Sequence, residues 1–348
     1  MQHWKGKTMI KEVFELNKSR NVTLTSYRLA LGGEFGNISK RPAVLVIPGG
    51  GYMMCSDREA DPVAISFLQA GFNTFVLRYS VAEHRTWPNP LEDYEQAMTM
   101  IREKSDEWGI FADKIAVIGF SAGGHLAACA ATIAKNKPNA AILGYAVIHG
   151  AELDPDIPDL AEHVDDNTCP CFMFGTRNDH LVSVHNALDF QKALANHDIT
   201  FESHIYGYGP HGFSTAAADL GDMSSLCSRA SSWVKDSVGW LFDIFGDFEA
   251  VGLGVPRCKP RTSADKDPFL SVDCSFALLM SRREARNLVM EVMEKYSSSQ
   301  EPSMPVSDTM AEMFAKMPLR DTLFVRKVPA EAVEELNNRL NAIPNVIK

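Results

Sequence analysis

Two patterns of apolar residues alternate along the chain from Pro42 onward. Short runs rich in Val, Ile and Phe are followed by longer stretches in which apolar residues recur at helical spacing. Apolar runs of this kind are typical of strands buried on both faces, as in parallel sheets covered by helices. The predicted strands are residues 43–47, 72–79, 115–118, 140–148, 171–175 and 199–206. The pattern therefore predicts an α/β fold with a mostly parallel, doubly wound sheet and helices on both faces.

Helices are predicted between these strands from their start signals and periodicity. Asp61-Pro62 combines a cap residue with a proline at the first helical position, and Asn89-Pro90 opens a second helix in the same way. Further helical segments are predicted at residues 125–134, 184–194 and 223–245. Residues 22–29 alternate between apolar and polar, so we expect an antiparallel strand at the edge of the sheet.

A different pattern begins after about Asp247. Residues 251–267 are rich in Gly, Pro and charged residues without a period, as is typical of a linker or an extended excursion. Amphipathic helices are predicted beyond it at residues 276–296, 308–317 and 330–340. We therefore predict a catalytic α/β domain over residues 1–246 and a mainly helical C-terminal appendage over residues 247–348. The appendage carries no catalytic motif, and we expect it to serve packing or formation of a homo-oligomer rather than to act as a lid.

The most informative motif is Gly-Phe-Ser-Ala-Gly at residues 119–123, between a predicted strand and a predicted helix. So tight a turn strains its central residue, and glycines two positions before and after it relieve clashes that a Cβ would create. Ser121 would then project above the sheet, toward the amide of Ala122 and the positive end of the helix. The motif predicts a nucleophile elbow with Ser121 as the nucleophile.

A serine nucleophile needs a histidine base, a carboxylate that orients the base, and donors for the oxyanion. In doubly wound hydrolases these groups follow the carboxyl ends of strands, in the chain order Ser, Asp, His. Asp179 lies just beyond the strand 171–175, and His211 follows the last strand among small residues that leave it room to reach Ser121. We therefore predict Asp179 as the acid and His211 as the base.

Other acids and histidines fit these two roles less well. Asp165 and Asp166 precede the strand that leads to Asp179, and Asp189 falls inside a helix. Asp179 itself could be a turn or helix-cap residue. His125 lies one turn into the elbow helix, where packing or support of the site residues is favoured. A structural role is also favoured for His84, His149, His180 and His185.

Three glycines follow the first predicted parallel strand, at residues 49–51. Glycine lets the backbone approach a reacting carbonyl with its N–H groups exposed, so we assign Gly50 and Gly51, together with Ala122, to an oxyanion hole. A phosphate-binding loop is a weaker alternative, because no Gly-Lys-Ser/Thr follows and the G-x-G-x-x-G spacing is missing. A plain tight turn would also fit the glycines, but their position one strand earlier in the sheet favours the catalytic interpretation.

Composition and charge limit the classes of substrate and partner that we expect the chain to bind. The chain has 348 residues, 45% hydrophobic and 22% charged, as in an ordinary globular enzyme. Its formal net charge of −10, without a basic cluster, repels nucleic acid and disfavours anionic membranes. We therefore expect a neutral small-molecule or saccharide ester as substrate, and neither nucleic acid nor membrane as partner.

The cysteines and the N-terminal sequence indicate a location. Seven cysteines without regular spacing favour free thiols over a disulfide framework. No apolar run approaches the roughly 18 residues of a membrane span, and no signal-peptide pattern is present, so we expect a reducing, cytoplasmic setting. The H-E-x-x-H and paired C-x-x-C spacings are absent, so we expect no metal and no cofactor.

Several motifs in order resemble those of α/β-hydrolase esterases, in particular the acetyl esterase and acetylxylan-esterase-like group of the esterases and lipases. They are residues 47–52, 79–84, 87–93 and 113–115, followed by the elbow. The resemblance covers about residues 20–245. One departure is Pro48, where relatives of the hormone-sensitive-lipase type carry histidine. This departure argues against membership of the hormone-sensitive-lipase branch. It does not argue against an oxyanion hole, because the donors there are backbone N–H groups.

The resemblance implies hydrolysis of short acyl esters, with an acetyl group on a sugar as the expected substrate, through an acyl-enzyme on Ser121. Candidate walls of the acyl or alcohol pocket are Tyr52, Met53, Trp87 and Phe213, each of which could equally belong to the core. Two other functions stay open, a serine peptidase of the prolyl-oligopeptidase type and a non-catalytic binding protein on the same fold. Turnover of aminoacyl amides without acetyl-ester hydrolysis would favour the first, and failure to react with a fluorophosphonate would favour the second.

Overall fold

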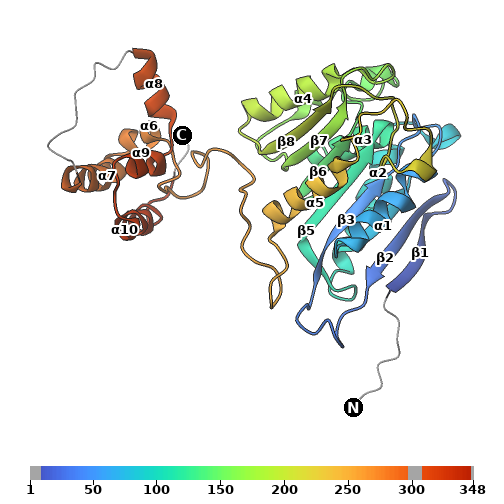
Figure 1. Cartoon of the computed structure of the whole chain (residues 1–348), viewed down its shortest axis with the longest axis horizontal. Coiled ribbons are helices and arrows are strands. Elements are labelled where there is room, and N and C mark those ends of the chain that lie inside the picture. The colour runs from blue at the N-terminus through green and yellow to red at the C-terminus, as the bar shows by residue number, and fades with distance from the viewer. Residues whose placement is uncertain (1–8, 297–307, 346–348) are drawn as a thin grey trace. The chain divides into compact units, whose positions relative to one another are not determined.

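The computed structural model describes residues 9–296 and 308–345. Its contacts divide the chain into two compact units, residues 1–260 and 261–348 (Figure 1). Residues 247–260, grouped with the appendage in the sequence analysis, lie in the first unit. Within them, Arg257 and Cys258 donate backbone hydrogen bonds to the carbonyl of Asp243. The functional roles of the two parts stay predictions.

The first unit is built on one eight-stranded sheet with the order β1-β2-β4-β3-β5-β6-β7-β8. Strands β3 to β8 run parallel to one another, and β2 pairs antiparallel with both β1 and β4. The strands are β1 Met9–Asn17, β2 Val22–Leu29, β3 Arg41–Ile47, β4 Asn73–Arg78, β5 Ile110–Phe120, β6 Ala140–Gly144, β7 Cys171–Thr176 and β8 Phe201–Tyr206. This order confirms the predicted mostly parallel, doubly wound sheet.

One strand that was not predicted extends the sheet beyond β2. Because β1 pairs with the outer side of β2, the expectation that residues 22–29 form the edge strand was wrong. In β1, Lys11 and Glu12 are exposed, whereas Phe14 packs against Trp108 with 5.2 Å between ring centroids. Charged side chains protect an exposed edge from pairing with other chains, and they also hide the strand pattern in the sequence.

Hydrophobic cores lie on both faces of the sheet. In β3, Leu45 and Ile47 belong to one core and Val44 and Val46 to the other, as the two-residue period of a strand requires. The first core is covered by α2 (Asn89–Glu103), α3 (Ser121–Thr132) and α4 (His185–Asn196), and the second by α1 (Asp61–Gln69) and α5 (Ser232–Phe245) (Figure 1). Helices on both faces are therefore confirmed.

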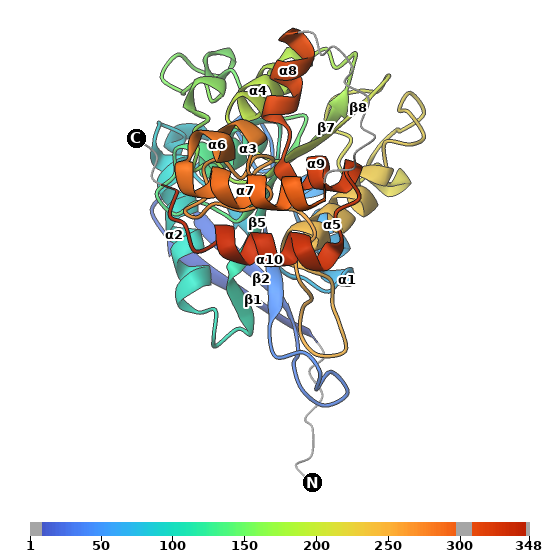
Figure 2. The same ribbon diagram turned by 90° about the vertical axis from the view of Figure 1, so that its left-hand side faces the viewer.

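The second unit is helical and has a core of its own. Its helices are α6 (Phe276–Ser281), α7 (Arg283–Lys295), α8 (Asp308–Lys316), α9 (Leu319–Val325) and α10 (Ala330–Leu340). Helices α7 and α10 lie side by side and are joined by an ion pair between Glu291 and Arg339 (Figure 2). The predicted helix 276–296 is interrupted at Arg282, whose backbone is extended. The short helix α9 was not predicted, because its seven residues hardly show a period.

The structure bears on two further features of the chain. The seven cysteines are free thiols. No helix within residues 9–296 and 308–345 has both the length and the apolar character needed to cross a membrane.

Candidate active site

Strand β5 passes directly into α3 at Ser121, and this junction leaves no room for side chains on its glycines. Ser121 has a left-handed backbone with φ of 52°, which is uncommon for a residue with a Cβ. A Cβ on Gly119 would collide with the carbonyl oxygen of Gly123, and one on Gly123 would collide with that of Pro48. Both glycines are therefore needed for the turn, which concentrates its strain on Ser121.

Three of the predicted site residues form one chain of hydrogen bonds. His211, beyond β8, places its Nε2 2.9 Å from Oγ of Ser121. Its Nδ1 lies 2.6 Å from Oδ2 of Asp179, beyond β7. Because a carboxylate only accepts, Nδ1 carries the proton and Nε2 offers its lone pair to the serine hydroxyl. An imidazole in this position can take the proton of an attacking serine.

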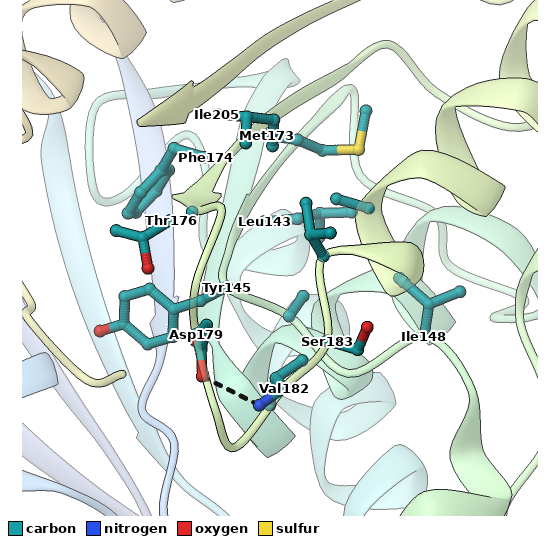
Figure 3. Close-up of a pocket in the computed structure, with 14 residues that line it drawn as sticks. Leu143, Tyr145, Ile148, Met173, Phe174, Thr176, Asp179, Val182, Ser183 and Ile205 are labelled. Atoms are coloured by element: carbon teal, nitrogen blue, oxygen red, sulfur yellow. Dashed lines mark hydrogen bonds between the residues drawn. The ribbon is translucent and has the colours of Figure 1, made fainter. Parts of the chain in front are cut away.

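The Asp179 carboxylate is held by its own loop. The side chain is 2% exposed, and Oδ1 accepts backbone hydrogen bonds from Leu181 and Val182 at 2.8 and 3.0 Å. Figure 3 shows Asp179 beside Val182, at the edge of a small and mostly apolar cavity. Burial alone raises the pKa of this carboxyl, but hydrogen bonds from His211, Val182 and Leu181 outweigh burial and lower the pKa below its ordinary value. Asp179 is therefore ionised at neutral pH.

The predicted oxyanion residues lie around the nucleophile. Gly50 and Gly51 have φ of 129° and 62° and line the same cavity as Ser121. None of the described residues accepts a hydrogen bond from the N–H of either glycine. Ala122 is the second residue of α3, so its N–H belongs to the first helical turn, where the positive end of the helix dipole lies. The assignment of these three amides to an oxyanion hole stays a prediction.

One cavity opens at Ser121, and a second cavity shares part of its wall. The first, of about 530 Å³, holds Ser121 and His211. Its other walls combine the apolar Met54, Val147, Leu153, Leu181 and Val182 with the charged Asp57, Arg58, Glu59 and Glu152. The second, of about 590 Å³, shares Gly51 and Leu153 with the first. Its other walls include Glu83, Arg85, Thr86, Asp154, Asp156 and Ile157. A substrate could therefore extend from one cavity into the other.

Of the four predicted pocket walls, Tyr52, Met53 and Trp87 line the second cavity and Phe213 lines neither. Phe213 is 1% exposed and packs in the core against Tyr145 and Phe174, with ring centroids 5.0 and 5.9 Å away. The expectation of a pocket role for Phe213 is corrected by this packing. Gly212, between His211 and Phe213, has φ of 75° and lines the first cavity together with His211.

His125 is a buried residue of the elbow helix. Its Nε2 lies 3.0 Å from the carbonyl oxygen of Pro158, and its Nδ1 lies 3.0 Å from the hydroxyl of Tyr52. Because a carbonyl only accepts, Nε2 carries the proton and Nδ1 accepts from Tyr52. Burial lowers the pKa of His125 to about 4, so the ring is neutral at neutral pH. These contacts agree with the packing role that the sequence favoured.

Asp189 and the other candidate histidines lie outside both cavities. His149 bridges Asp159 and Asp189, at 2.7 and 3.2 Å, which places Asp189 in a different pair. His84, His180 and His185 are exposed or half-buried and line neither cavity. Within the described ranges, no group of three or more His, Cys, Asp or Glu side chains is arranged to hold a metal ion.

Two buried residues of the site were not predicted. Glu59 is 4% exposed, and its carboxylate accepts hydrogen bonds from the N–H of Gly49 at 2.9 Å and from the hydroxyl of Tyr145 at 2.6 Å. The ring of Tyr145 lies edge-on to the imidazole of His211, with 4.9 Å between centroids. In the sequence Glu59 lies among charges before a helix and Tyr145 within an apolar run, so neither position carries a signal.

Known proteins resemble the first unit. The BD-FAE family model matches residues 36–146, which include the glycine loop and Ser121. The crystal structure of MGS-M1, an α/β-hydrolase enzyme from a Medee basin deep-sea metagenome library, is 40% identical to the chain. It aligns with a TM-score of 0.64 over 68% of this chain and 98% of that one.

Two curated proteins also match. Endo-1,4-beta-xylanase B of Butyrivibrio fibrisolvens is 33% identical over 210 residues, which are 51% of this chain. Acetylxylan esterase of Xylanibacter ruminicola is 29% identical over 196 residues, or 49% of this chain. The match spans 33% of the length of the first relative and 41% of the second.

Proposed function

The chain belongs to the α/β-hydrolase family, and from this premise we propose that it is a serine carboxylesterase that hydrolyses short acyl esters, with acetyl esters of saccharides as substrates. One observation carries the proposal: His211 bonds to both Ser121 and Asp179, beside glycine amides that have no acceptor among the described residues. Such a constellation suits acyl transfer through a serine nucleophile.

In the proposed mechanism, Ser121 Oγ attacks the acyl carbon while His211 Nε2 takes its proton. The carbonyl oxygen becomes an oxyanion that the amides of Gly50, Gly51 and Ala122 stabilise. The bond to the alcohol oxygen then breaks, and His211 returns the proton to that oxygen. A water molecule, deprotonated by His211, next attacks the acyl carbon of the acyl-enzyme. The bond from that carbon to Ser121 Oγ breaks, His211 returns the proton to Oγ, and the acid leaves. Asp179 keeps Nδ1 protonated and stabilises the imidazolium in both steps.

The walls of the first cavity support a short acyl group. Apolar side chains such as Val147 and Leu153 can cover a methyl or ethyl group beside Ser121. A long alkyl chain in the same cavity would meet the charged Arg58 and Glu152, and the removal of water from these charges is costly.

The second cavity supports a saccharide as the alcohol. Carboxylates accept and guanidinium groups donate hydrogen bonds, so Asp154 and Arg85 can bind sugar hydroxyls. The half-buried Trp87 offers an apolar surface for the C–H face of a sugar ring. The name of the matched acetylxylan esterase from Xylanibacter ruminicola agrees with such a substrate.

A panel of p-nitrophenyl esters from acetate to octanoate, together with acetylated xylo-oligosaccharides, tests the proposal. We expect the fastest turnover on acetate or propionate and release of acetate from the saccharide. Ser121→Ala should lose on the order of 10³-fold or more in kcat. Ser237→Ala is the matched control, because that buried hydroxyl donates to the carbonyl of Val234 in its own helix and lines neither cavity.

Other outcomes of this panel would reject parts of the proposal. A maximum at octanoate would reject the short acyl group and leave the mechanism intact. Cleavage of aminoacyl amides without acetyl-ester turnover would indicate a peptidase. No reaction with a fluorophosphonate would indicate a binding protein.

The cellular setting and assembly are also proposals. The free thiols of all seven cysteines support the reducing cytoplasm as the location. We further propose that the second unit contributes to packing or to a homo-oligomer, which sedimentation of the full chain would test.

A further inference from the structure

We propose that Glu59 is a positioning residue that couples the glycine loop of the oxyanion hole to the loop that carries His211. The proposal rests on the serine-esterase function proposed above. It assigns Glu59 a role in setting the positions of the oxyanion donors and of the base His211. Glu59 itself does not react with the substrate.

Glu59 joins the two loops through consecutive hydrogen bonds. Its Oε2 accepts from the N–H of Gly49 at 2.9 Å, and its Oε1 accepts from the hydroxyl of Tyr145 at 2.6 Å. The Tyr145 oxygen in turn accepts from the N–H of Ser214 at 3.0 Å. Ser214 follows His211 closely in the chain. The path therefore leads from the oxyanion loop to the loop of the base.

The far end of this path is anchored by two more bonds. Ser214 is fully buried and has φ of 49°, a conformation that needs support from its surroundings. Its Oγ donates to the carbonyl of Arg58 at 2.5 Å, and its own carbonyl accepts from the indole N–H of Trp233 at 2.8 Å. Because Arg58 adjoins Glu59, residues 58–59 hold Ser214 directly through the Arg58 carbonyl and indirectly through the Tyr145 hydroxyl.

The near end of the path lies against the nucleophile. A Cβ on Gly49 would be 2.6 Å from the carbonyl oxygen of Phe120 and 3.1 Å from Cβ of Ser121, so the Gly49 backbone packs directly on the elbow. The bond from Gly49 to Glu59 fixes this backbone, and the proposed donor amides of Gly50 and Gly51 follow it immediately. A shift at Gly49 would therefore move the donors relative to Ser121, where small displacements are costly in the transition state.

Tyr145 connects the same carboxylate to the base. Its ring lies edge-on to the imidazole of His211, with 4.9 Å between centroids, and its side chain is buried. The bond between Tyr145 and Glu59 therefore fixes the orientation of a ring that supports the base. Both groups that must be aligned with the reacting carbonyl thus depend on one buried side chain.

The chemistry of position 59 favours a carboxylate over other side chains. Burial of a carboxylate is costly unless its oxygens accept hydrogen bonds, and Glu59 accepts one on each oxygen. Glutamine has the same shape but a single acceptor oxygen, so it would leave one of the two donors facing an NH₂ group. Glu59→Gln is therefore a minimal disruption of the path, and Tyr145→Phe removes only the bridging hydroxyl.

The test measures Glu59→Gln, Tyr145→Phe and the double variant on p-nitrophenyl acetate, with sites counted by complete reaction with diethyl p-nitrophenyl phosphate. We expect kcat per site to fall about 10-fold or more in each single variant, with KM within about twofold of wild type. The kcat of the double variant should be about equal to that of the slower single variant, because both changes break the same path of hydrogen bonds. The rate of reaction with the organophosphate should fall in parallel, since it uses the same base and donors.

Glu95→Gln and Tyr94→Phe are the matched controls. Glu95 accepts backbone hydrogen bonds from Lys135 and Asn136, and Tyr94 is a buried tyrosine whose hydroxyl donates to the carbonyl of Asn136. Neither lines the two cavities, so both should keep the kcat of wild type.

Three results separate the proposal from its competitors. A lower melting temperature with unchanged kcat per site would show a purely structural role and overturn the proposal. Losses in kcat that multiply in the double variant would also overturn it, because they would show two independent effects. If Glu59→Gln fails to fold, the kcat of Tyr145→Phe tests the proposal alone. That variant keeps the ring that packs on His211 and removes only the hydroxyl that bonds to Glu59. A wild-type chain that reacts with neither the ester nor the organophosphate would instead overturn the proposed function.

Discussion

The hydroxyl of Tyr52 donates a hydrogen bond to Nδ1 of His125 across 3.0 Å and joins the glycine loop to the elbow helix. The same imidazole donates from Nε2 to the carbonyl of Pro158, in the segment after β6 that lines both cavities. In the neutral imidazole Nε2 carries the proton, so Nδ1 has a lone pair that accepts from Tyr52. One buried histidine thus joins three segments around the site.

This histidine should make the fold less stable in acid. Burial lowers its pKa from 6.5 to about 4 in the folded chain. Between these values the unfolded chain binds a proton that the folded chain does not, so the free energy of unfolding falls as the pH falls. Below the folded pKa, the free energy of unfolding has lost about 3 kcal/mol because of this group. Above the pKa of the unfolded chain, the group causes no loss. Urea unfolding of wild type and His125→Gln across this range should show a flatter pH dependence in the variant. Equal slopes would contradict the assignment.

Asp179→Asn should abolish most activity while it leaves the fold intact. The asparagine oxygen can still accept from Leu181 and Val182, but its NH₂ group would face Nδ1 of His211 and favour the wrong tautomer. We expect kcat to fall about 10³- to 10⁴-fold, as in other serine triads. Thermal unfolding serves as the check on folding.

Asp159→Asn is the matched control for that variant. Asp159 also pairs with a histidine nitrogen, Nδ1 of His149, at 2.7 Å, but this pair lines neither cavity. Wild-type kcat is expected. An equal loss in both variants would indicate a general effect of removing an Asp–His pair.

The sequence predicted those parts of the site that follow from local patterns. Ser121 lies in a strand–turn–helix motif, and Asp179 and His211 each follow a recognisable strand. Because the carboxyl ends of parallel strands meet at one edge of the sheet, the sequence predicted that all three residues lie there. Glu59 and Tyr145 are separated by 86 residues, and their hydrogen bond depends on packing across the sheet. Strand β1 was missed for a related reason, since a strand exposed at an edge lacks the apolar pattern.

The two glycines of the predicted oxyanion hole should respond differently to a methyl group. A Cβ on Gly50 would overlap the carbonyl oxygen of Met54, whereas one on Gly51 has nothing within 4 Å. Gly51 has φ of 62°, so alanine there costs only about 1 kcal/mol and keeps the amide in place. We expect Gly51→Ala to retain most of its kcat/KM and Gly50→Ala to lose most of it. Similar losses in both would show that the loop does not act through its backbone alone.

Removal of the second unit should leave catalysis unchanged, provided that the cut follows Pro260. Every residue that lines the two cavities lies between residues 50 and 212, and the second unit has a separate core. A cut after residue 246 would instead remove Phe248, which packs on Phe242 with 5.7 Å between ring centroids, and the backbone donors to Asp243.

We therefore expect the chain 1–260 to keep the wild-type kcat and KM on p-nitrophenyl acetate and on the acetylated saccharide, and the chain 1–246 to unfold at a lower temperature. Steady-state kinetics per titrated site and thermal unfolding check the two expectations. A folded 1–260 chain with an altered KM for the saccharide alone would assign the second unit to substrate binding. An altered kcat on both esters would assign it a role as a lid over Ser121.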